Sequence, residues 1–144
     1  MIKIAIIGAG LSGITIAYLL KNKFHVDIFE KSRGIGGRMS TKRIPPFVFD
    51  HGAQYFTISS DSFKSFLNPL LKAEVIKPWY GKNVIIDSDK VKEIEASILP
   101  HIYYVGVPNM NSVVKYFAKS CNVILNTKVV EVVKNNNKWS IKDE

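Results

Sequence analysis

Three glycines near the start of the chain have the spacing G-x-G-x-x-G, in the run Gly8-Ala9-Gly10-Leu11-Ser12-Gly13. Such a run binds a diphosphate when it follows a buried strand and opens a helix, because its glycines allow a tight turn, close approach of the phosphates and close packing of the helix on the strand. The helix then offers free amides and a partial positive charge to the anion. The predicted contacts here are Gly8, Gly10, Leu11 and Gly13.

An acidic residue, Glu30, follows Gly13 by seventeen positions and ends the next apolar segment. A carboxylate at that position can accept both ribose hydroxyls of an adenosine, and it would repel a 2′-phosphate. The motif therefore predicts FAD or NAD rather than NADP. The glycine run and Glu30 do not by themselves separate these two dinucleotides.

The surrounding residues predict the elements that position these motifs. Residues 2–7 form a continuous apolar run that is typical of a buried parallel strand, residues 11–20 predict a helix, and residues 25–29 predict a second strand. Together they make a βαβ unit. Residues 122–125 predict a third parallel strand, and residues 128–142 predict a β-hairpin around three asparagines.

The middle of the chain predicts a more irregular arrangement. A polar loop is expected over residues 31–46, followed by short strands at 47–50 and 54–58. Ser59 or Ser60 is expected to cap a helix that runs to about Leu71. Strand-like segments between 74 and 104 predict a small antiparallel sheet, and Asn109 or Asn111 is expected to cap a helix over 112–119.

A second glycine-rich segment separates FAD from NAD. The run Glu30-Lys31-Ser32-Arg33-Gly34-Ile35-Gly36-Gly37-Arg38 resembles the second phosphate-binding signature of amine-oxidase-like flavoproteins. In that family the double glycine passes close to the cofactor and the arginine faces the pyrophosphate. A guanidinium grips phosphate oxygens in a bidentate way that lysine cannot match. The resemblance implies FAD as the cofactor, bound by Lys31, Gly36, Gly37 and Arg38.

Two further motifs narrow the resemblance to the renalase-like branch of these flavoproteins. They are Gly37-Arg38-Met39-Ser40-Thr41 and Phe49-Asp50-His51-Gly52-Ala53-Gln54-Tyr55-Phe56-Thr57, and the similarity runs in the same order over essentially all 144 residues. The resemblance implies an α/β, Rossmann-like FAD-binding βαβ domain with an incomplete parallel sheet, a small inserted antiparallel β region and a β-hairpin. It also implies FAD contacts from Ser12, Met39, Ala53, Gln54 and Tyr55, and an adenine contact from the backbone of Val129.

The same resemblance implies a function and a domain division. Residues 1–58 would form the FAD-binding βαβ unit with its phosphate loops, 59–108 the start of a substrate region, and 109–144 a return to the FAD-binding domain. The complete enzyme would transfer a hydride from a reduced nicotinamide dinucleotide isomer or an amine to the flavin, and then pass electrons to an acceptor such as oxygen. No catalytic residue is assigned, because the substrate-facing part is expected to lie elsewhere.

Relatives of the family are much longer, so the chain is expected to be truncated, to leave its first strand at an open edge and to be inactive alone. Two alternatives stay open. The chain could be the FAD-binding half of a split enzyme completed by a second chain, or an NAD-binding Rossmann-like module without redox activity.

Composition excludes several other classes. The net charge is +8, but seventeen of the twenty basic residues are lysines spread along the whole chain, whereas nucleic-acid binders concentrate their charge and mix in arginine. Glycines interrupt the apolar N-terminal segment, which argues against a signal peptide or a membrane span and predicts a cytoplasmic protein. The single cysteine, Cys121, excludes an internal disulfide and a multi-cysteine zinc site.

Overall fold

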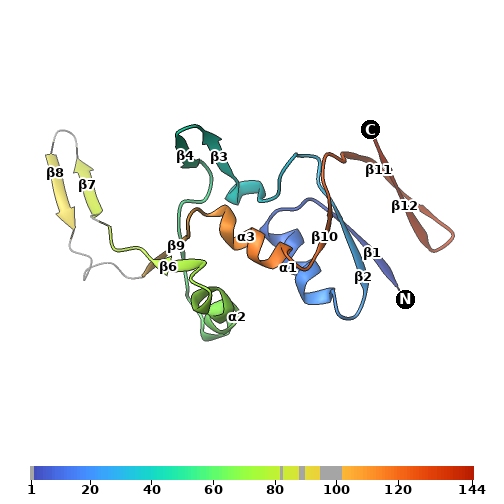
Figure 1. Cartoon of the computed structure of the whole chain (residues 1–144), viewed down its shortest axis with the longest axis horizontal. Helices are drawn as coiled ribbons and strands as arrows, with labels where there is room; N and C mark the ends of the chain where they lie inside the picture. Colours follow the sequence, from blue (N-terminus) through green and yellow to red (C-terminus); the bar gives the residue numbers. More distant parts are fainter. Residues whose placement is uncertain (1, 82, 88–89, 95–101) are drawn as a thin grey trace.

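A three-stranded parallel sheet organises the N-terminal part of the chain. In the computed structural model, which describes residues 2–81, 83–87, 90–94 and 102–144, the strands β1 (Lys3–Ile7), β2 (His25–Phe29) and β10 (Asn122–Ile124) lie in the order β1-β2-β10 (Figure 1). Ile28 of β2 pairs with Ile6 of β1 on one side and with Val123 of β10 on the other. The prediction of a third parallel strand beside the second is confirmed, and β1 is an edge strand of this sheet.

Two helices bury part of the apolar residues of this unit, whereas Ile7, Ile16 and Leu19 stay exposed. Helix α1 (Leu11–Leu20) connects β1 to β2, and α3 (Asn111–Ala118) packs against α1 before the chain enters β10. Ile14, Ile28, Val114 and Phe117 are almost completely buried between these elements. The Phe117 ring stacks on Phe66, 5.1 Å between centroids, so the core extends to the helix that carries Phe66.

The expected loop over residues 31–46 is only partly a loop. A 3-10 turn, η1 (Gly37–Met39), is followed by strand β3 (Thr41–Ile44), which pairs antiparallel with β4 (Phe47–Asp50). The prediction of a loop is therefore wrong over residues 41–44, whereas residues 45 and 46 form a turn. Strand β3 is hard to recognise in the sequence. Lys42 and Arg43 are both exposed, so the segment shows no alternation of apolar and polar residues.

The middle region contains a helix and two small antiparallel sheets. Helix α2 (Asp61–Lys72) begins after Ser60, whose hydroxyl accepts the amide of Phe63 at 3.2 Å, as one of the two predicted caps. The first sheet has the order β5-β9-β6, formed by residues Phe56–Thr57, Tyr103–Gly106 and Ile76–Pro78. The second is the hairpin β7 (Asn83–Asp87) and β8 (Lys90–Ile94), so the antiparallel region is two sheets rather than one.

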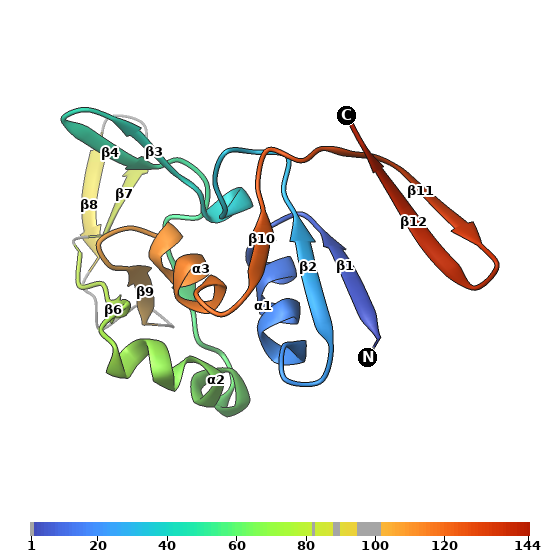
Figure 2. The ribbon, with the colours of Figure 1, turned by 45° about the vertical axis from the view of Figure 1, so that its right-hand side comes forward.

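The last described segment is the predicted β-hairpin. Strands β11 (Val129–Asn135) and β12 (Lys138–Asp143) pair antiparallel and extend away from the parallel sheet (Figures 1 and 2). Asn136 and Asn137 form the turn with φ of 46° and 62°. Asparagine tolerates this left-handed region better than other residues with a side chain, which explains why the asparagine run predicts the turn.

The cap of α3 differs from the prediction. Met110, rather than Asn109 or Asn111, is the N-cap residue, and its amide donates to Oδ2 of Asp50 at 3.0 Å. The two asparagine side chains bind other elements: the Asn109 Oδ1 lies 3.2 Å from the hydroxyl of Thr41, and the Asn111 amide donates to the carbonyl of Ile35. An acid sixty residues away thus replaces the local cap.

Candidate functional site

The first glycine turn has the geometry that a phosphate-binding turn requires. Gly8 follows β1 directly with a φ of 97°, and its amide donates to the carbonyl of Phe29 at 2.8 Å. A Cβ on Gly13 would lie 2.2 Å from the carbonyl oxygen of Gly8, so only glycine lets α1 pass this close to the turn. A Cβ on Gly10, in contrast, would meet open space. Gly10 therefore borders the side from which a ligand can approach.

The start of α1 is suited to an anion. Its N-cap is Gly10, which has no side chain to accept the first helix amides, and its first turn has no acidic residue. The side chains of Leu11 and Ser12 are exposed there. An anion at this point would accept the free amides and be stabilised by the positive end of the helix.

The second glycine segment packs directly on the first. Gly36 forms a parallel bridge with Gly10, and its amide donates to the carbonyl of Ala9 at 2.9 Å. A Cβ on Gly37 would lie 3.2 Å from the Cα of Gly10. The structure thus packs the second glycine turn (Gly36 and Gly37) against the first (Gly8, Gly10 and Gly13), directly after β1 at the carboxyl end of the parallel sheet.

Glu30 ties this turn to the end of β2. Its Oε2 accepts the amide of Ala9 at 2.7 Å and its Oε1 accepts the amide of Ser32 at 2.8 Å, while the residue is almost fully buried. Burial acts to raise the pKa of this carboxyl, but the two amides, the Ser32 side chain and the nearby Lys31 outweigh it and lower the pKa. Glu30 is therefore ionised at neutral pH.

The segment before the C-terminal hairpin lies beside Glu30. The amide of Thr127 donates to the Glu30 carbonyl at 2.9 Å, and the amide of Asn126 donates to the carbonyl of Ser32. Val129 begins β11 two residues later and is half-buried. Residues nearly one hundred positions apart therefore meet at the end of β2, where the sequence predicts the adenosine.

The Asp50–Thr57 motif joins the same region through η1. The amide of Ala53 donates to the carbonyl of Arg38 at 2.8 Å, and a Cβ on Gly52 would lie 2.0 Å from that oxygen. The Arg38 side chain is exposed and takes part in none of the ion pairs of the described residues, whereas Met39 is buried in the core. Arg38 is thus held by its backbone and keeps a free guanidinium.

The predicted site residues fall into two groups. The first group is joined by contacts among the two glycine turns, β2 and η1. Its members are Gly8, Gly10, Gly13, Glu30, Gly36, Gly37, Arg38 and Ala53, and Leu11, Ser12, Lys31 and Met39 are their neighbours in the chain. Gln54 and Tyr55 are exposed farther on, toward β5, where the Tyr55 ring lies 4.5 Å from that of Tyr103. The assignment of both groups, and of Val129, to a cofactor stays a prediction.

The residues that support this region through hydrogen bonds from β4 and α3 were not predicted from the sequence. Asp50 accepts hydrogen bonds from the Thr41 hydroxyl at 2.6 Å and from the Met110 amide at 3.0 Å. Asn111 binds Ile35, directly before Gly36. The only signal in the sequence was that Asp50 had no predicted hydrogen-bond partner and that Asn111 was one of two alternative caps for α3. Their partners, Met110 and Ile35, are 60 and 76 residues away in the chain.

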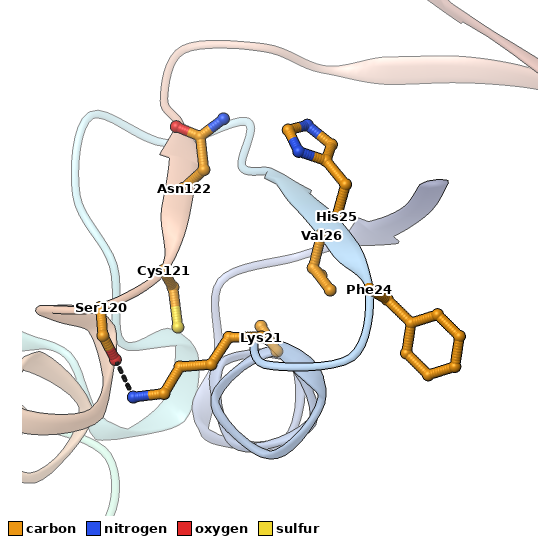
Figure 3. Close-up of a pocket in the computed structure, with 8 residues that line it drawn as sticks. Lys21, Phe24, His25, Val26, Ser120, Cys121 and Asn122 are labelled. Carbon is orange, nitrogen blue, oxygen red and sulfur yellow. Dashed lines mark hydrogen bonds between the residues drawn. The ribbon is translucent and has the colours of Figure 1, made fainter. Parts of the chain in front are cut away.

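A shallow pocket of about 200 Å³ lies at the opposite, amino end of the sheet (Figure 3). Lys21 donates to the hydroxyl of Ser120 across it at 2.7 Å, and Cys121, His25 and Asn122 form part of its wall. Burial raises the pKa of the Cys121 thiol, which lies 3.5 Å from the Phe117 carbonyl. A protonated thiol is a poor nucleophile, and none of the predicted site residues lines this pocket.

Among the described residues, no group of three or more His, Cys, Asp or Glu residues is placed to hold a metal ion. None of the helices in the described part of the chain has the length and apolar character needed to cross a membrane.

Known proteins share both the sequence and the fold of this chain. Residues 6–70 match the family of NAD(P)-binding Rossmann-like domains. Renalase from Mus musculus is 29% identical over 153 residues, covering 98% of this chain and 42% of renalase. The chain therefore spans less than half the length of that relative.

Two solved structures have the same fold. They are a putative protoporphyrinogen oxidase from Exiguobacterium sp. 255-15, with a TM-score of 0.71 at 10% identity, and a double mutant of putrescine oxidase from a redesign of cofactor binding, with a TM-score of 0.72 at 15% identity. Each covers 99% of this chain, and the chain covers 56% and 54% of them.

These likenesses agree with the geometry of the two glycine turns. The family match and the similarity to renalase indicate a nucleotide cofactor of the flavin or nicotinamide type. In sequence the chain is similar to renalase over 98% of its length, and in fold it is similar to about half of each of the two oxidase structures.

Proposed function

We propose that the chain binds FAD, with the adenosine at the end of β2 and the pyrophosphate along the two glycine turns. It would serve as the dinucleotide-binding portion of an enzyme that transfers a hydride from a reduced substrate to the flavin. The domain division at residues 58 and 108 is part of this proposal. Similarity to renalase over 98% of the chain supports it.

The packing of the second glycine turn on the first is the observation that carries the choice of FAD. A nicotinamide-binding Rossmann unit needs only the first turn, the helix after it and the acid at the end of the second strand. Here Gly36 is bonded to Ala9, and Arg38 follows with a free guanidinium. A second turn with an arginine adds phosphate ligands that suit the pyrophosphate of FAD.

The adenosine end fits the same cofactor. Each oxygen of Glu30 accepts one backbone amide, and the Ser32 side chain adds a third hydrogen bond. Because a carboxylate offers about four acceptor positions in all, capacity remains for a ribose hydroxyl. The lowered pKa keeps the group ionised, which favours a ribose diol and disfavours a 2′-phosphate. The backbone of Val129 is proposed to contact the adenine.

Bound FAD would supply the hydride-accepting ring, and the residues of this chain would bind and orient it. A reduced nicotinamide dinucleotide isomer or an amine is the proposed substrate. An acceptor such as oxygen would then take the electrons from the reduced flavin. A second chain that supplies the substrate region is the alternative form of this proposal. An NAD-binding module without redox activity is the competing one.

Titration of the purified chain with FAD and with NAD tests the proposal. We expect visible flavin absorbance that stays with the protein through gel filtration, and no competition by NAD at equal concentration. Arg38→Ala should raise the dissociation constant for FAD about 10-fold to 100-fold, since it removes a charge-assisted bidentate contact. Arg43→Ala, an exposed arginine on β3, is the matched control and should bind FAD like the parent chain.

Each negative result has a distinct meaning. Binding of NAD without FAD would favour the competing module. Equal FAD affinity in the two arginine variants would exclude the role given to Arg38. Flavin binding without turnover would favour the split enzyme if a copurifying chain restores the turnover.

A further inference from the structure

Asn111 is the residue of α3 that reaches the second glycine turn. Its side-chain amide donates to the carbonyl of Ile35 at 2.8 Å. The packing is close, because a Cβ on Gly36 would lie 2.7 Å from Nδ2 of Asn111. Gly36 also has a φ of 131°, a conformation that other residues rarely adopt.

The peptide between Ile35 and Gly36 is therefore held on both sides. Its carbonyl accepts the Asn111 amide, and its N–H donates to the carbonyl of Ala9 in the first turn. The two polar groups of a trans peptide point in opposite directions. The first glycine turn and α3 thus fix the plane of this peptide between them, immediately before Gly37 and Arg38.

The other polar atom of the same side chain indicates a purpose beyond stability. Oδ1 of Asn111 is buried and has no hydrogen-bond partner among the described residues, and the whole residue is 4% exposed. A buried acceptor without a partner opposes folding, which offsets much of what the bond to Ile35 contributes. A small apolar residue would be at least as compatible with a stable helix start.

We propose that Asn111 is a positioning residue that fixes the Ile35–Gly36 peptide, and through it Arg38, for binding the cofactor's pyrophosphate. This inference rests on the proposed binding of FAD. It assigns the affinity for the dinucleotide partly to a side chain that does not touch it. The β4 residue Asp50 supports the same end of α3 by accepting the Met110 amide.

The variant Asn111→Ala separates positioning from stability. It removes both the bond to Ile35 and the unpartnered oxygen, so the melting temperature should change by less than about 3 °C. The dissociation constant for FAD should rise about threefold to tenfold, the equivalent of one hydrogen bond. Ser112→Ala, at the next position of the same helix turn, is the matched control and should change neither quantity.

Hydrogen exchange of single amides, measured without FAD, gives an independent readout. In Asn111→Ala the Gly36 amide should exchange about tenfold faster, because its peptide has lost one of its two anchors. The Gly8 amide, bonded to Phe29, should exchange as in the parent chain. Asn111→Ser, which shortens the side chain but keeps it polar, repeats both measurements with a smaller change in burial.

Unchanged Gly36 exchange and unchanged FAD affinity in these variants would overturn the inference. So would equally faster exchange at Gly8 and Gly36 with a large fall in melting temperature, since that result describes a general structural role. Failure of the parent chain to bind FAD would instead count against the proposed function, and the exchange of Gly36 would still decide the role of Asn111 in the turn.

Discussion

The parallel unit and the hairpins of this chain use apolar residues in opposite ways. In the β1-α1-β2 unit with α3 and β10, Ile28 and Phe117 are at most 1% exposed. In the hairpins β3–β4, β7–β8 and β11–β12, by contrast, Phe47, Ile86 and Trp139 are 62%, 70% and 67% exposed. The parallel unit therefore has a buried core, which the hairpins lack, although Ile7, Ile16 and Leu19 of the same unit are 56%, 48% and 60% exposed.

The difference shows where the stability and the site of this chain lie. A hairpin is defined by its turn and its own backbone hydrogen bonds, and a two-stranded sheet is marginally stable by itself. The parallel strands can be held only through helices that pack on them, so their register depends on the core. The two glycine turns are attached to the parallel unit, so their positions depend on its core. Substitutions should therefore have large effects in the parallel unit and small effects in the hairpins.

The largest effect is expected for Phe117→Ala. Phe117 contacts Tyr18 of α1, Phe66 of α2 and Tyr116, with ring centroids 5.0 Å, 5.1 Å and 5.7 Å away. Removing a fully buried ring costs about 3–5 kcal/mol, through lost transfer free energy and the cavity that remains. Urea unfolding followed by circular dichroism measures it. A loss below about 1 kcal/mol would mean that the three helices do not share one core.

A pair of glycine substitutions tests the first turn. Gly13→Ala places a Cβ 2.2 Å from the Gly8 carbonyl and should cost about 3 kcal/mol, because the backbone must shift. Gly10→Ala meets no atom and should cost less than about 1 kcal/mol. Thermal unfolding of both variants gives the comparison. Equal losses would contradict the assignment of Gly13 to helix packing and of Gly10 to the ligand side.

These two regions were also unequally predictable from the sequence. Residues 11–20 and 25–29 have the predicted bounds because glycine and apolar runs mark them locally. The strand at Thr41–Ile44 was missed because its exposed residues give no apolar alternation. The division of the antiparallel region into two sheets depends on pairing between distant strands, which local patterns do not encode.

The candidate site divides in the same way. Gly8, Gly13 and Glu30 could be identified because their roles follow from short spacings within one βαβ unit. The supports Asp50 and Asn111 could not, since their partners lie in other elements. Helix capping was predicted from local side chains, whereas the structure caps α3 with an acid from β4.

A smaller loss of stability, about 2 kcal/mol, is expected for Glu30→Gln. The carboxylate accepts amides from Ala9 and Ser32 with its two oxygens, whereas a carboxamide has one acceptor and turns a donor toward the other amide. Chemical denaturation at pH 7 measures the change. A variant as stable as the parent would show that these two bonds contribute little.

The same residue predicts a pH dependence. The folded-state pKa of Glu30 lies below its ordinary value of 4.5, so the unfolded chain binds this proton more tightly. The contribution is therefore fully present above about pH 4.5 and is lost as the pH falls through the folded-state pKa. Unfolding curves of the parent and Glu30→Gln should converge as the pH is lowered. A constant difference down to pH 2 would contradict the assignment.

The smallest effect is expected for Trp139→Ala in the β11–β12 hairpin. The ring is 67% exposed, and the ammonium of Lys134 lies 5.7 Å from its centroid, a contact that contributes about 0.5 kcal/mol at an exposed position. We expect a loss of at most about that amount, against several kcal/mol for the other aromatic, Phe117. The Trp139 fluorescence, read in a Trp79→Phe background because the chain has two tryptophans, should accordingly be quenched readily by iodide. A loss comparable to that of Phe117→Ala, or a ring protected from quencher, would mean that another surface covers this hairpin in solution and that the contrast between the two regions is incomplete.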